Sequence, residues 1–410
     1  MRKFYLGLIL LLFLISSSAC NLYTEASNEP NLPAPAPVPV LKEDEVLVIS
    51  AVGDIMMHNT QLKAGYLSTS GDYDYSTFFT HVKPLLSASD LAIGNLETTF
   101  AGAKAGYSGY PQFNSPEILA SNLKNTGFDV LVTANNHCLD KRQSGLISTL
   151  DTLDAVGLFH TGTFRTQEER DSTLIVEKKG LKIAVFSYTY GTNGLSPDKD
   201  KPYSVNYIAT DKIITDIKKA RAEDSAQLVI VCLHFGLEYQ PYPNDEQQQI
   251  VKRLFEEGAD IILGSHPHVL QPAFIYNIEE TKDIDSKFAI YSFGNFISDQ
   301  KGLERLTSII LNLYIGIDRE SGAPYFKEAS YIPIRTRRYR QDGKYNFEIL
   351  PIEAALASSN SRLEHFSIQE INDLEASLEY VSKHLQTDNP LFKLKPLDIP
   401  LEGLQLIKKW

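Results

Sequence analysis

The stretch Ala259-Asp260-Ile261-Ile262-Leu263, followed by Gly264-Ser265-His266-Pro267-His268, joins a short apolar run to two histidines. The apolar run predicts a buried strand that ends at the Gly-Ser step. Two imidazoles spaced two residues apart, just past a strand end, can turn toward one point, and neutral imidazole is the commonest protein metal ligand. Taken alone, this His-x-His segment is equally compatible with a structural turn.

Four other apolar runs end in the same way, in a Gly, an Asn or a side chain that can bind metal. These are Val46–Val52 before Gly53-Asp54, Leu91–Ile93 before Gly94-Asn95-Leu96-Glu97, Val130–Thr133 before Asn135-Asn136-His137, and Leu228–Leu233 before His234. Open α/β sheets present their chemistry at the carboxyl ends of their strands. Singly, Asp54 could be a helix N-cap and Asn136 a turn residue. Together the five strand ends predict one metal site.

The ligand types narrow the choice of metal. Carboxylates, an amide and imidazoles without a thiolate cluster suit Mn, Fe, Zn or Mg rather than Cu or an iron–sulfur cluster. We expect one or two divalent ions, with Mn, Fe or Zn preferred. Two ions about 3.5–4 Å apart would activate a water and clamp a phosphoryl oxygen.

The order of these motifs resembles the bacterial capsule-synthesis CapA-type family. It runs Gly-Asp, Gly-Asn-x-Glu, Asn-Asn-His-x-x-Asp, His-x-Gly-x-Glu and Gly-x-His-x-His, and the resemblance covers about residues 45 to 300. Asn114-Ser115-Pro116-Glu117 and Ser292-Phe293-Gly294-Asn295-Phe296 also fit it. That family is associated with poly-γ-glutamate capsules and is a divergent branch of the calcineurin-like metallophosphoesterases. The resemblance implies a layered αββα sandwich.

The resemblance also implies roles for individual residues. The metal ligands would be Asp54, Glu97, Asn136, His234, His266 and His268, with His58, Asn95 and Glu238 as further candidates. His137 would protonate a leaving oxygen, and Asp140, three residues later, would orient it. His234 and His266 would bind one ion and His268 the other.

Two departures from the metallophosphoesterase pattern leave two functions open. Met56 stands where a histidine is usual, and Asn95 replaces the bridging aspartate. Asparagine lacks the charge to bridge two cations well, so the second ion would bind weakly. The intact ligands favour a metal-dependent hydrolase or transferase. The departures favour a non-catalytic protein that binds or guides polymer chains beside membrane capsule-synthase subunits. The expected substrate is an anionic polymer or a phosphorylated compound.

The N-terminus predicts export. Arg2 and Lys3 precede an apolar run, Phe4–Ile15, and small residues lead to Cys20. This is the layout of a secretory signal, and Cys20 resembles the lipidated residue of a lipoprotein. Ordinary secretion or an uncleaved anchor are the alternatives. We expect a lipid anchor in the cell membrane with the protein on the extracytoplasmic face.

The expected organisation has four parts: a signal peptide over 1–20, a Pro-rich linker over 21–45, a metallophosphoesterase-like domain over 46–345 and a helical extension over 346–410. Alternating prolines between 33 and 39 favour an extended spacer in the linker. Helical patterns are expected over Tyr75–Leu86, Glu117–Thr126, Gly145–Ala155, Asp211–Ala222, Asp245–Glu257 and Ile368–Leu385. Their alternation with the strands predicts an α/β fold, and the β-rich pattern over Lys287–Ile334 predicts the second sheet of the sandwich.

Charge and cysteine content bound the remaining choices. The formal net charge is −12, and no basic stripe accompanies it, which argues against a nucleic-acid partner. Cys138 and Cys232, the cysteines other than Cys20, are expected to be buried and unpaired, although a disulfide between them is an alternative. Aromatic residues beside the motif segments are a candidate surface for gripping a polymer or sugar. They are Tyr107, Tyr110, Phe113, Tyr188, Tyr190, Tyr203, Tyr239 and Tyr242.

Overall fold

The computed structural model describes residues 44–277, 286–341, 343–361, 366–385, 389 and 391–395. The expected signal peptide, the expected lipidation site Cys20 and the linker up to residue 43 lie outside the described residues. Within those residues, no helix combines the length and the apolar character needed to cross a bilayer.

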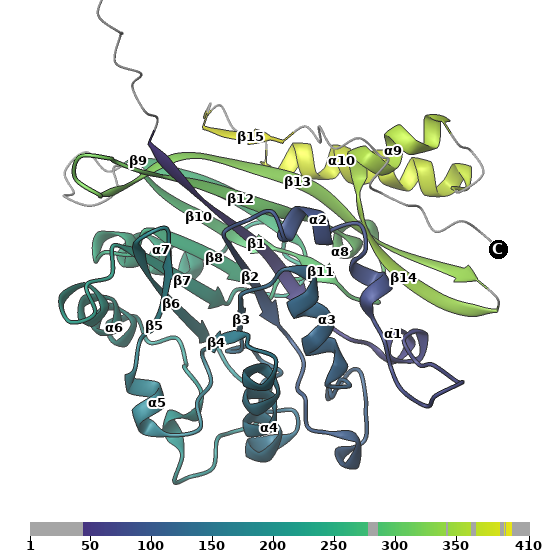
Figure 1. The fold of residues 1–410 in the computed structure, drawn as a ribbon, viewed down its shortest axis with the longest axis horizontal. Helices are drawn as coiled ribbons and strands as arrows, with labels where there is room; N and C mark the ends of the chain where they lie inside the picture. The colour runs from purple at the N-terminus through teal and green to yellow at the C-terminus, as the bar shows by residue number, and fades with distance from the viewer. Residues whose placement is uncertain are drawn as a thin grey trace, which may run out of the picture. The chain divides into compact units, whose positions relative to one another are not determined.

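Two sheets form the centre of the fold (Figure 1). The first sheet runs β14 (Lys344–Pro351), β13 (Pro324–Gln341), β12 (Thr307–Ile317), β1 (Glu45–Ile55), β2 (Leu91–Leu96), β3 (Val130–Val132) and β4 (Phe159–Thr161), with β11 (Asn295–Ile297) beside β1 and β15 (Phe392–Leu394) beside β13. The second sheet runs β5 (Leu174–Lys178), β6 (Leu181–Thr189), β7 (Leu228–His234), β8 (Ile261–Ser265), β10 (Ser286–Phe293) and β9 (Leu270–Asn277).

The side chains of β7 show how the two sheets pack. Leu228, Ile230 and Cys232 belong to the apolar cluster between the sheets, which also contains residues of β1, β2 and β12. Val229 and Val231 alternate with them and pack in a separate cluster on the outer face of the second sheet. Successive side chains of a strand point to opposite faces, so a strand buried on both faces reads as a continuous apolar run.

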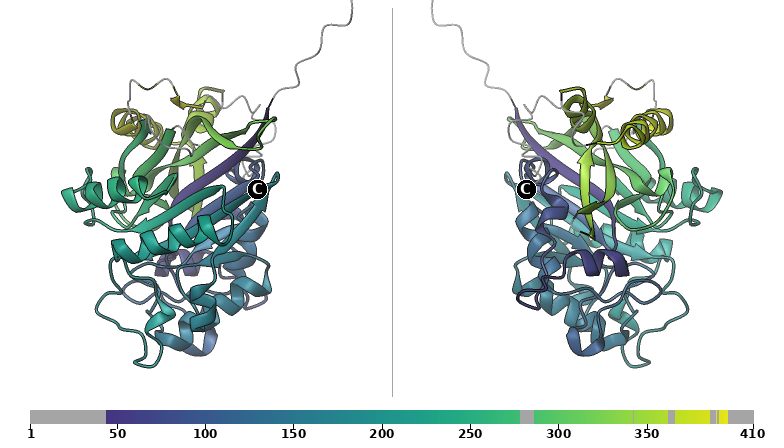
Figure 2. Two further views of the ribbon diagram at one scale, coloured as in Figure 1. Left: turned by 90° about the vertical axis from the view of Figure 1, so that its left-hand side faces the viewer. Right: turned by 90° about the vertical axis from the view of Figure 1, so that its right-hand side faces the viewer.

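Helices cover both outer faces (Figures 1 and 2). The first sheet packs against α1 (Asn59–Ala64), α2 (Lys83–Leu86), α3 (Ile118–Thr126) and α4 (Arg142–Ala155). The second sheet packs against α6 (Thr210–Ala222) and α7 (Asp245–Glu256). The remaining helices are α5 (Gln167–Asp171), α8 (Leu303–Leu306), α9 (Ile352–Ser361) and α10 (Ile368–Leu385), with 3₁₀ turns η1 (Ser76–Phe79), η2 (Ala103–Ala105) and η3 (Pro202–Ser204). This arrangement confirms the predicted layered α/β sandwich.

Two expectations about elements were wrong. The helix expected over Tyr75–Leu86 is split into η1 and α2, because Pro84 has no N–H and fits only the first turn of a new helix. The β-rich segment after residue 287 does not form the second sheet alone. Only β10 joins that sheet, whereas β12 pairs antiparallel with β1 and extends the first sheet through β13 and β14.

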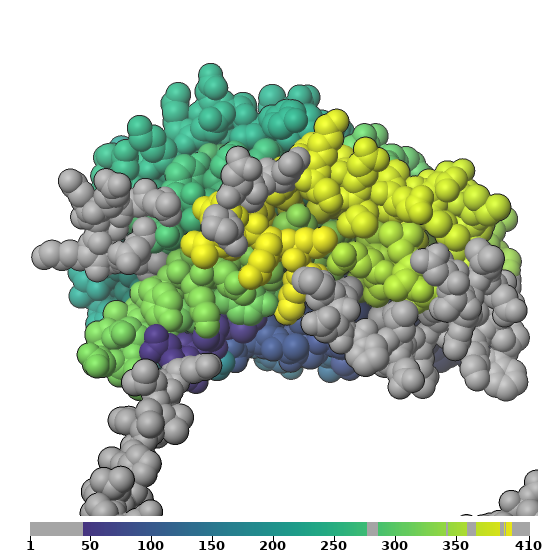
Figure 3. Space-filling view, turned by 90° about the horizontal axis from the view of Figure 1, so that it is seen from above, coloured from purple at the N-terminus to yellow at the C-terminus, as the bar shows by residue number. Residues whose placement is uncertain are grey.

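The C-terminal helix α10 packs on strands of both sheets. It contacts β9 of the second sheet and β12 and β13 of the first. Val381 and Leu385 on this helix are buried in the cluster between the sheets. Figure 3 shows the yellow C-terminal segment lying across the green strands. The expected division at residues 345 and 346, which falls within β14, stays a prediction.

Glycines before the ligand-bearing turns permit close backbone contact. A Cβ on Gly264 would lie 2.0 Å from the carbonyl oxygen of Tyr291 in the neighbouring strand. A Cβ on Gly53 would lie 1.9 Å from the carbonyl oxygen of Gly294. No other residue fits without moving these strands, and their spacing fixes where Asp54 and His266 emerge.

Candidate metal centre

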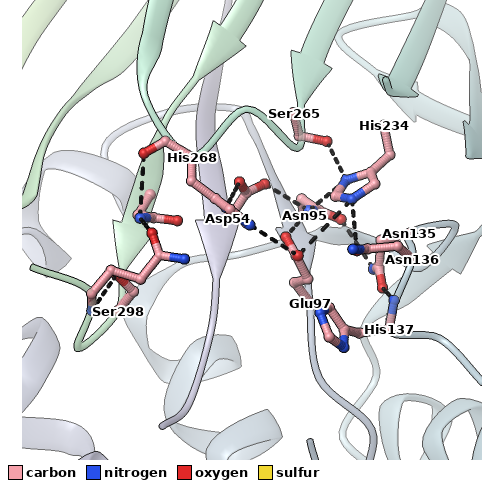
Figure 4. Close-up of polar contacts among 12 residues, drawn as sticks. Asp54, Asn95, Glu97, Asn135, Asn136, His137, His234, Ser265, His268 and Ser298 are labelled. Carbon is pink, nitrogen blue, oxygen red and sulfur yellow. Dashed lines mark hydrogen bonds and ion pairs between the residues drawn. The ribbon is translucent and has the colours of Figure 1, made fainter. Parts of the chain in front are cut away.

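The strand ends of both sheets meet on one side of the sandwich. β1, β2 and β3 run parallel in the first sheet, and β7 and β8 run parallel in the second. Their carboxyl ends therefore carry the predicted residues to one place. The buried members are Asp54, Asn95, Glu97, Asn136, His137, Asp140, His234, His266 and His268. Figure 4 shows the acidic residues lying between His268 on one side and His234 on the other.

Two carboxylates form the middle of the site. Asp54 is completely buried at the end of β1, and its Oδ2 lies 2.9 Å from Nδ1 of His268. Glu97 follows β2, and its Oε1 lies 3.7 Å from Nε2 of His268 and 3.9 Å from Nε2 of His234. One carboxylate oxygen thus stands between histidines that come from two different strands of the second sheet.

Asn95 lies between the two acids. Its Nδ2 donates to Oδ1 of Asp54 at 2.8 Å and to Oε2 of Glu97 at 3.2 Å. Its Oδ1 accepts a hydrogen bond from Nδ2 of Asn135 at 3.2 Å. An uncharged amide donor thus contacts both carboxylates at once and reduces their mutual repulsion.

Asn135 and Ser265 belong to the site although the motif analysis assigned them no role. Asn135 also donates to the carbonyl oxygen of Leu96 at 2.7 Å, which ties the turn after β3 to β2. Ser265 Oγ lies 2.9 Å from Nδ1 of His234. The Asn-Asn doublet and the serine before His266 were visible in the sequence, but their targets are contacts between strands that a linear motif does not show.

His234 is oriented through both ring nitrogens. Its Nε2 lies 3.0 Å from Oδ1 of Asn136, and its Nδ1 contacts Ser265. Tyr190 lies beside the same histidines, with its ring centroid 4.5 Å from that of His266. Asn136 thus reaches the expected ligand cluster through its amide oxygen.

His137 and Asp140 form a buried pair. Nδ1 of His137 lies 2.7 Å from Oδ2 of Asp140, which also accepts the backbone N–H of Phe113 at 2.7 Å. The Phe113 ring packs edge-on against His137 with centroids 4.7 Å apart. With Nδ1 held by Asp140, Nε2 is the ring nitrogen left to exchange a proton.

The donor atoms gather in two groups that suit a divalent cation. Asp54, Glu97 and His234 offer atoms within 4.8 Å of one another, and so do Glu238, His266 and His268. This grouping differs from the expected one, in which His234 and His266 share an ion and His268 binds the other. The described residues provide no hydrogen-bond partner for Oε1 of Glu97 or for Nδ1 of His266, although both atoms are buried. Burying an unpaired polar atom costs about 1–3 kcal/mol, more when it is charged. A cation among these oxygen and nitrogen donors would satisfy them, so the residues present fit a metal.

The ionisation of the site follows from burial and crowding. Burial, together with Asp54 and Glu238, raises the pKa of Glu97 well above its ordinary value. Burial and the neighbouring histidines lower the pKa of His234 far below normal, and the same combination lowers that of His266 to about 3. The imidazoles are therefore neutral, which is the form that binds metal. A bound cation would favour the ionised form of Glu97 and reverse its shift.

The backbone around the histidines is constrained. His266 has φ 98° and His268 has φ 57°, both in the left-handed region that side chains with a Cβ rarely adopt. The carbonyl oxygen of Pro267 between them accepts the N–H of Tyr239 at 2.8 Å. Such conformations cost of order 1–3 kcal/mol each and cluster at functional sites. Here they turn both imidazoles toward the carboxylates.

His58 lies outside both groups of donor atoms. It precedes α1, where its N–H donates to Oε1 of Gln61 at 2.8 Å, and its Nδ1 accepts the N–H of Asp299 at 3.3 Å. Burial lowers its pKa to about 4 against the opposing effect of Asp299. Its ring also packs edge-on against Phe113, with centroids 5.3 Å apart, so His58 borders the site.

The aromatic residues expected beside the site fall into two groups, those that pack against its histidines and those that do not. Phe113, Tyr190 and Tyr239 pack against His137, His266 and His268, respectively. Tyr107 instead donates to Glu117, and Tyr188 to Asp216 on the outer face of the second sheet. Cys138 and Cys232 are both buried and free, as expected.

Comparison with known proteins identifies the family. A profile described as bacterial capsule synthesis protein PGA_cap matches residues 48–300. The chain is 30% identical over 310 residues to the PGA biosynthesis protein CapA of Bacillus subtilis (strain 168), covering 73% of this chain and 76% of that protein. It is 31% identical over 268 residues to the capsule biosynthesis protein CapA of Bacillus anthracis, covering 63% and 61%, respectively.

A solved structure, the sulfate thiohydrolase SoxB of Thermus thermophilus in complex with glycerol, aligns with a TM-score of 0.40 and 14% identity, over 83% of this chain and 61% of that one. This likeness is too low to bear on function. The sequence matches are stronger, and the profile spans all the donor residues from Asp54 to His268. The chain therefore belongs to the bacterial capsule synthesis protein family described as PGA_cap.

Proposed function

We propose that this protein is a component of poly-γ-glutamate capsule synthesis with a metal-dependent hydrolase or transferase site. Its two CapA relatives are named for PGA biosynthesis and for capsule biosynthesis. The observation that carries the catalytic part is Oε1 of Glu97, a buried oxygen placed between His234 and His268 with no hydrogen-bond partner among the described residues.

Two groups of residues would hold the metal. Asp54, Glu97 and His234 would bind one divalent ion, and a second would bind at Glu238, His266 and His268. Oxygen and imidazole donors without thiolates suit Mn, Fe or Zn. A divalent ion there would act as a Lewis acid and lower the pKa of a water molecule.

The protein's own side chains would handle the proton. His137 would donate from Nε2 to the leaving atom of a phosphoryl or amide centre, because Asp140 holds its Nδ1 at 2.7 Å. Phe113 would keep the ring in place through the edge-on contact at 4.7 Å. Asn136, whose Oδ1 lies 3.0 Å from Nε2 of His234, would be a further ligand of the ion that this nitrogen binds.

One observation favours a second function, a non-catalytic protein that binds or guides polymer beside a membrane synthase. Asn95, an uncharged side chain, stands between Asp54 and Glu97 where a carboxylate could have bridged two ions. A site that holds a single ion could serve to bind an anionic chain rather than to cleave it.

We propose further that Cys20 carries a lipid and that the Pro-rich segment after it spaces the folded residues from the membrane. The support is the order of basic residues, apolar run and small residues before Cys20. In a bacterial host, Cys20→Ser should shift the protein from the membrane fraction to a soluble one. Equal membrane recovery of both forms would remove the proposal.

The metal proposal is tested by metal content. The purified full chain is incubated with Mn, Fe or Zn, desalted and analysed for bound metal, alongside His266→Ala and, as a control, His160→Ala, whose ring contacts Asp154 outside the site. We expect one or two ions per chain in the wild type and the control, and a loss of about one ion in His266→Ala. Turnover of γ-linked glutamate polymer and of a phosphate monoester then separates enzyme from guide. A wild-type chain without metal would refute the metal site.

A further inference from the structure

A positively charged side chain stands at the margin of the donor cluster. The guanidinium carbon of Arg305, on the short helix α8, lies 4.8 Å from the centroid of the Tyr239 ring. The Tyr239 ring in turn lies 6.1 Å from the ring of His268. The Arg305 guanidinium thus lies over the ring of Tyr239, which packs against His268, a proposed metal ligand.

The backbone of Arg305 is fixed to the same framework as the site. Nδ2 of Asn295 donates to the carbonyl oxygen of Arg305 at 3.0 Å and contacts the carbonyl oxygen of His268 at 3.4 Å. Asn295 lies on β11, where it is in register with Asp54 on β1. One buried amide therefore holds Arg305 and His268 to the strand that carries Asp54.

Tyr239 is held in place by its main chain and by contact of its hydroxyl with Glu238. It has φ 64°, in the left-handed region, and its N–H donates to the carbonyl oxygen of Pro267 between the two histidines. Its side chain is 44% exposed. A strained, half-exposed tyrosine gains little from apolar burial, which indicates that its position serves the site.

Arg305 differs in its contacts from the arginines on β13. Arg335, Arg337 and Arg338 on β13 each pair with a carboxylate. In the part of the chain that the structure describes, Arg305 forms the contact with Tyr239 and no ion pair. Its guanidinium therefore keeps its donors for another partner.

The negative charge of the protein explains why an anionic substrate would need an arginine near the site. The chain carries a formal charge of −12, and the acidic residues counted in it include Asp54, Glu97 and Glu238 at the site. Where a bound ion does not neutralise them, these acidic residues repel an anionic polymer that approaches the site. A guanidinium offers a planar pair of N–H donors that matches two oxygens of one carboxylate or phosphate.

We propose that Arg305, supported by Tyr239, is a specificity-determining subsite that binds an anionic oxygen pair of the substrate next to the reacting group. This inference rests on the proposed function and names its substrate class. The free α-carboxylate of a γ-linked glutamate polymer is the assigned occupant, and a substrate phosphate offers the same chemistry.

The test measures binding of a labelled γ-linked glutamate oligomer to the full chain by fluorescence anisotropy, with inorganic phosphate as a competitor. The variants are Arg305→Ala, Arg305→Lys and the control Arg253→Ala, which removes an exposed charge on α7. We expect Arg305→Ala to weaken oligomer binding about ten- to a hundredfold, the range for losing charge-assisted hydrogen bonds. Arg305→Lys should retain part of the affinity, and Arg253→Ala should bind as the wild type does.

Several results would overturn the inference. The first is that Arg305→Ala binds the oligomer as tightly as the wild type does at equal thermal stability, and the second is that the wild type does not bind the oligomer. The third is that Arg305→Ala changes only the competition by phosphate, which would assign the subsite to phosphate instead. Metal content measured on the same samples separates the two proposals. A metal-free wild type that still needs Arg305 to bind the oligomer refutes the metal site alone. If Arg305→Ala keeps its full metal content and binds the oligomer with wild-type affinity, only the subsite is refuted.

Discussion

Glu348 on β14 joins three parts of the fold, and Glu348→Gln tests how much that junction contributes to stability. Its Oε2 lies 3.1 Å from Nε2 of His81, and its Oε1 accepts from Arg337 on β13 at 2.7 Å. Arg337 also donates to Glu370 on α10 at 2.7 Å. Its side chain is 7% exposed, so water replaces these partners poorly.

The expected loss follows from these contacts. A hydrogen bond to a charged group contributes about 1.5–3 kcal/mol, and a neutral one about 1. Glutamine keeps the shape but loses the charge at both contacts of Glu348, while Arg337 keeps Glu370 as a partner. We expect the free energy of unfolding at pH 7 to fall by about 2–3 kcal/mol, equivalent to roughly 5 °C in Tm for a chain of this size.

The pH dependence gives a second check on Glu348. Burial alone would raise the pKa of its carboxyl, but hydrogen bonds from His81 and Arg337 outweigh burial and hold that pKa below its ordinary 4.5. The ionised carboxylate therefore stabilises the fold fully above pH 4.5, and this contribution is lost as the pH falls through the lowered folded-state pKa. The difference in unfolding free energy between wild type and Glu348→Gln should shrink on acidification from pH 7 to pH 4.

Urea denaturation followed by circular dichroism measures both quantities. The control is Glu328→Gln, which removes a partly exposed carboxylate paired with the exposed Lys393 and should cost no more than about 0.5 kcal/mol. The reasoning fails if Glu348→Gln matches this control at pH 7, or if its deficit grows as the pH is lowered.

Three further predictions concern the candidate metal centre. His137→Ala should abolish turnover and leave metal content unchanged, whereas Asp54→Ala should lose metal; full activity in His137→Ala would remove the proton-donor role. Asn95→Asp should lower the Tm of metal-free protein through repulsion and raise bound metal toward two ions per chain, and unchanged metal content would contradict this. Gly264→Ala should destabilise the fold by about 3 kcal/mol or more in urea, because the new Cβ meets Tyr291 at 2.0 Å, and wild-type stability would show that β8 can shift.

The strands that carry the site were predictable because each is a short apolar run ending in a polar residue. The alternation within β7 separates inner from outer side chains, and the gathering of Asp54, Glu97 and His234 follows from parallel strand ends. The helix over Ile368–Leu385 was also predicted to the residue, because its apolar positions repeat at helical spacing.

Other features depend on contacts that a linear pattern does not encode. The antiparallel pairing of β12 with β1 joins segments more than 250 residues apart, and the sequence of β12 fits either sheet. The same holds for Asn135, whose partners Asn95 and Leu96 lie on a neighbouring strand. The position of the Arg305 guanidinium over the Tyr239 ring could not be predicted either, because only the turn after β11 brings Arg305 near the site.

The pairing of β12 with β1 separates the family signature from the unit that folds. The PGA_cap match ends at residue 300, before β12 begins at Thr307. β1, which delivers Asp54, is paired with β12 from Glu45 to Ala51, and α10 closes over the sandwich from still further along the chain. A protein trimmed to the matched segment would keep the proposed ligands but expose an unpaired edge on their supporting strand, inviting aggregation. Fragments for expression or domain grafting should therefore extend through residue 395.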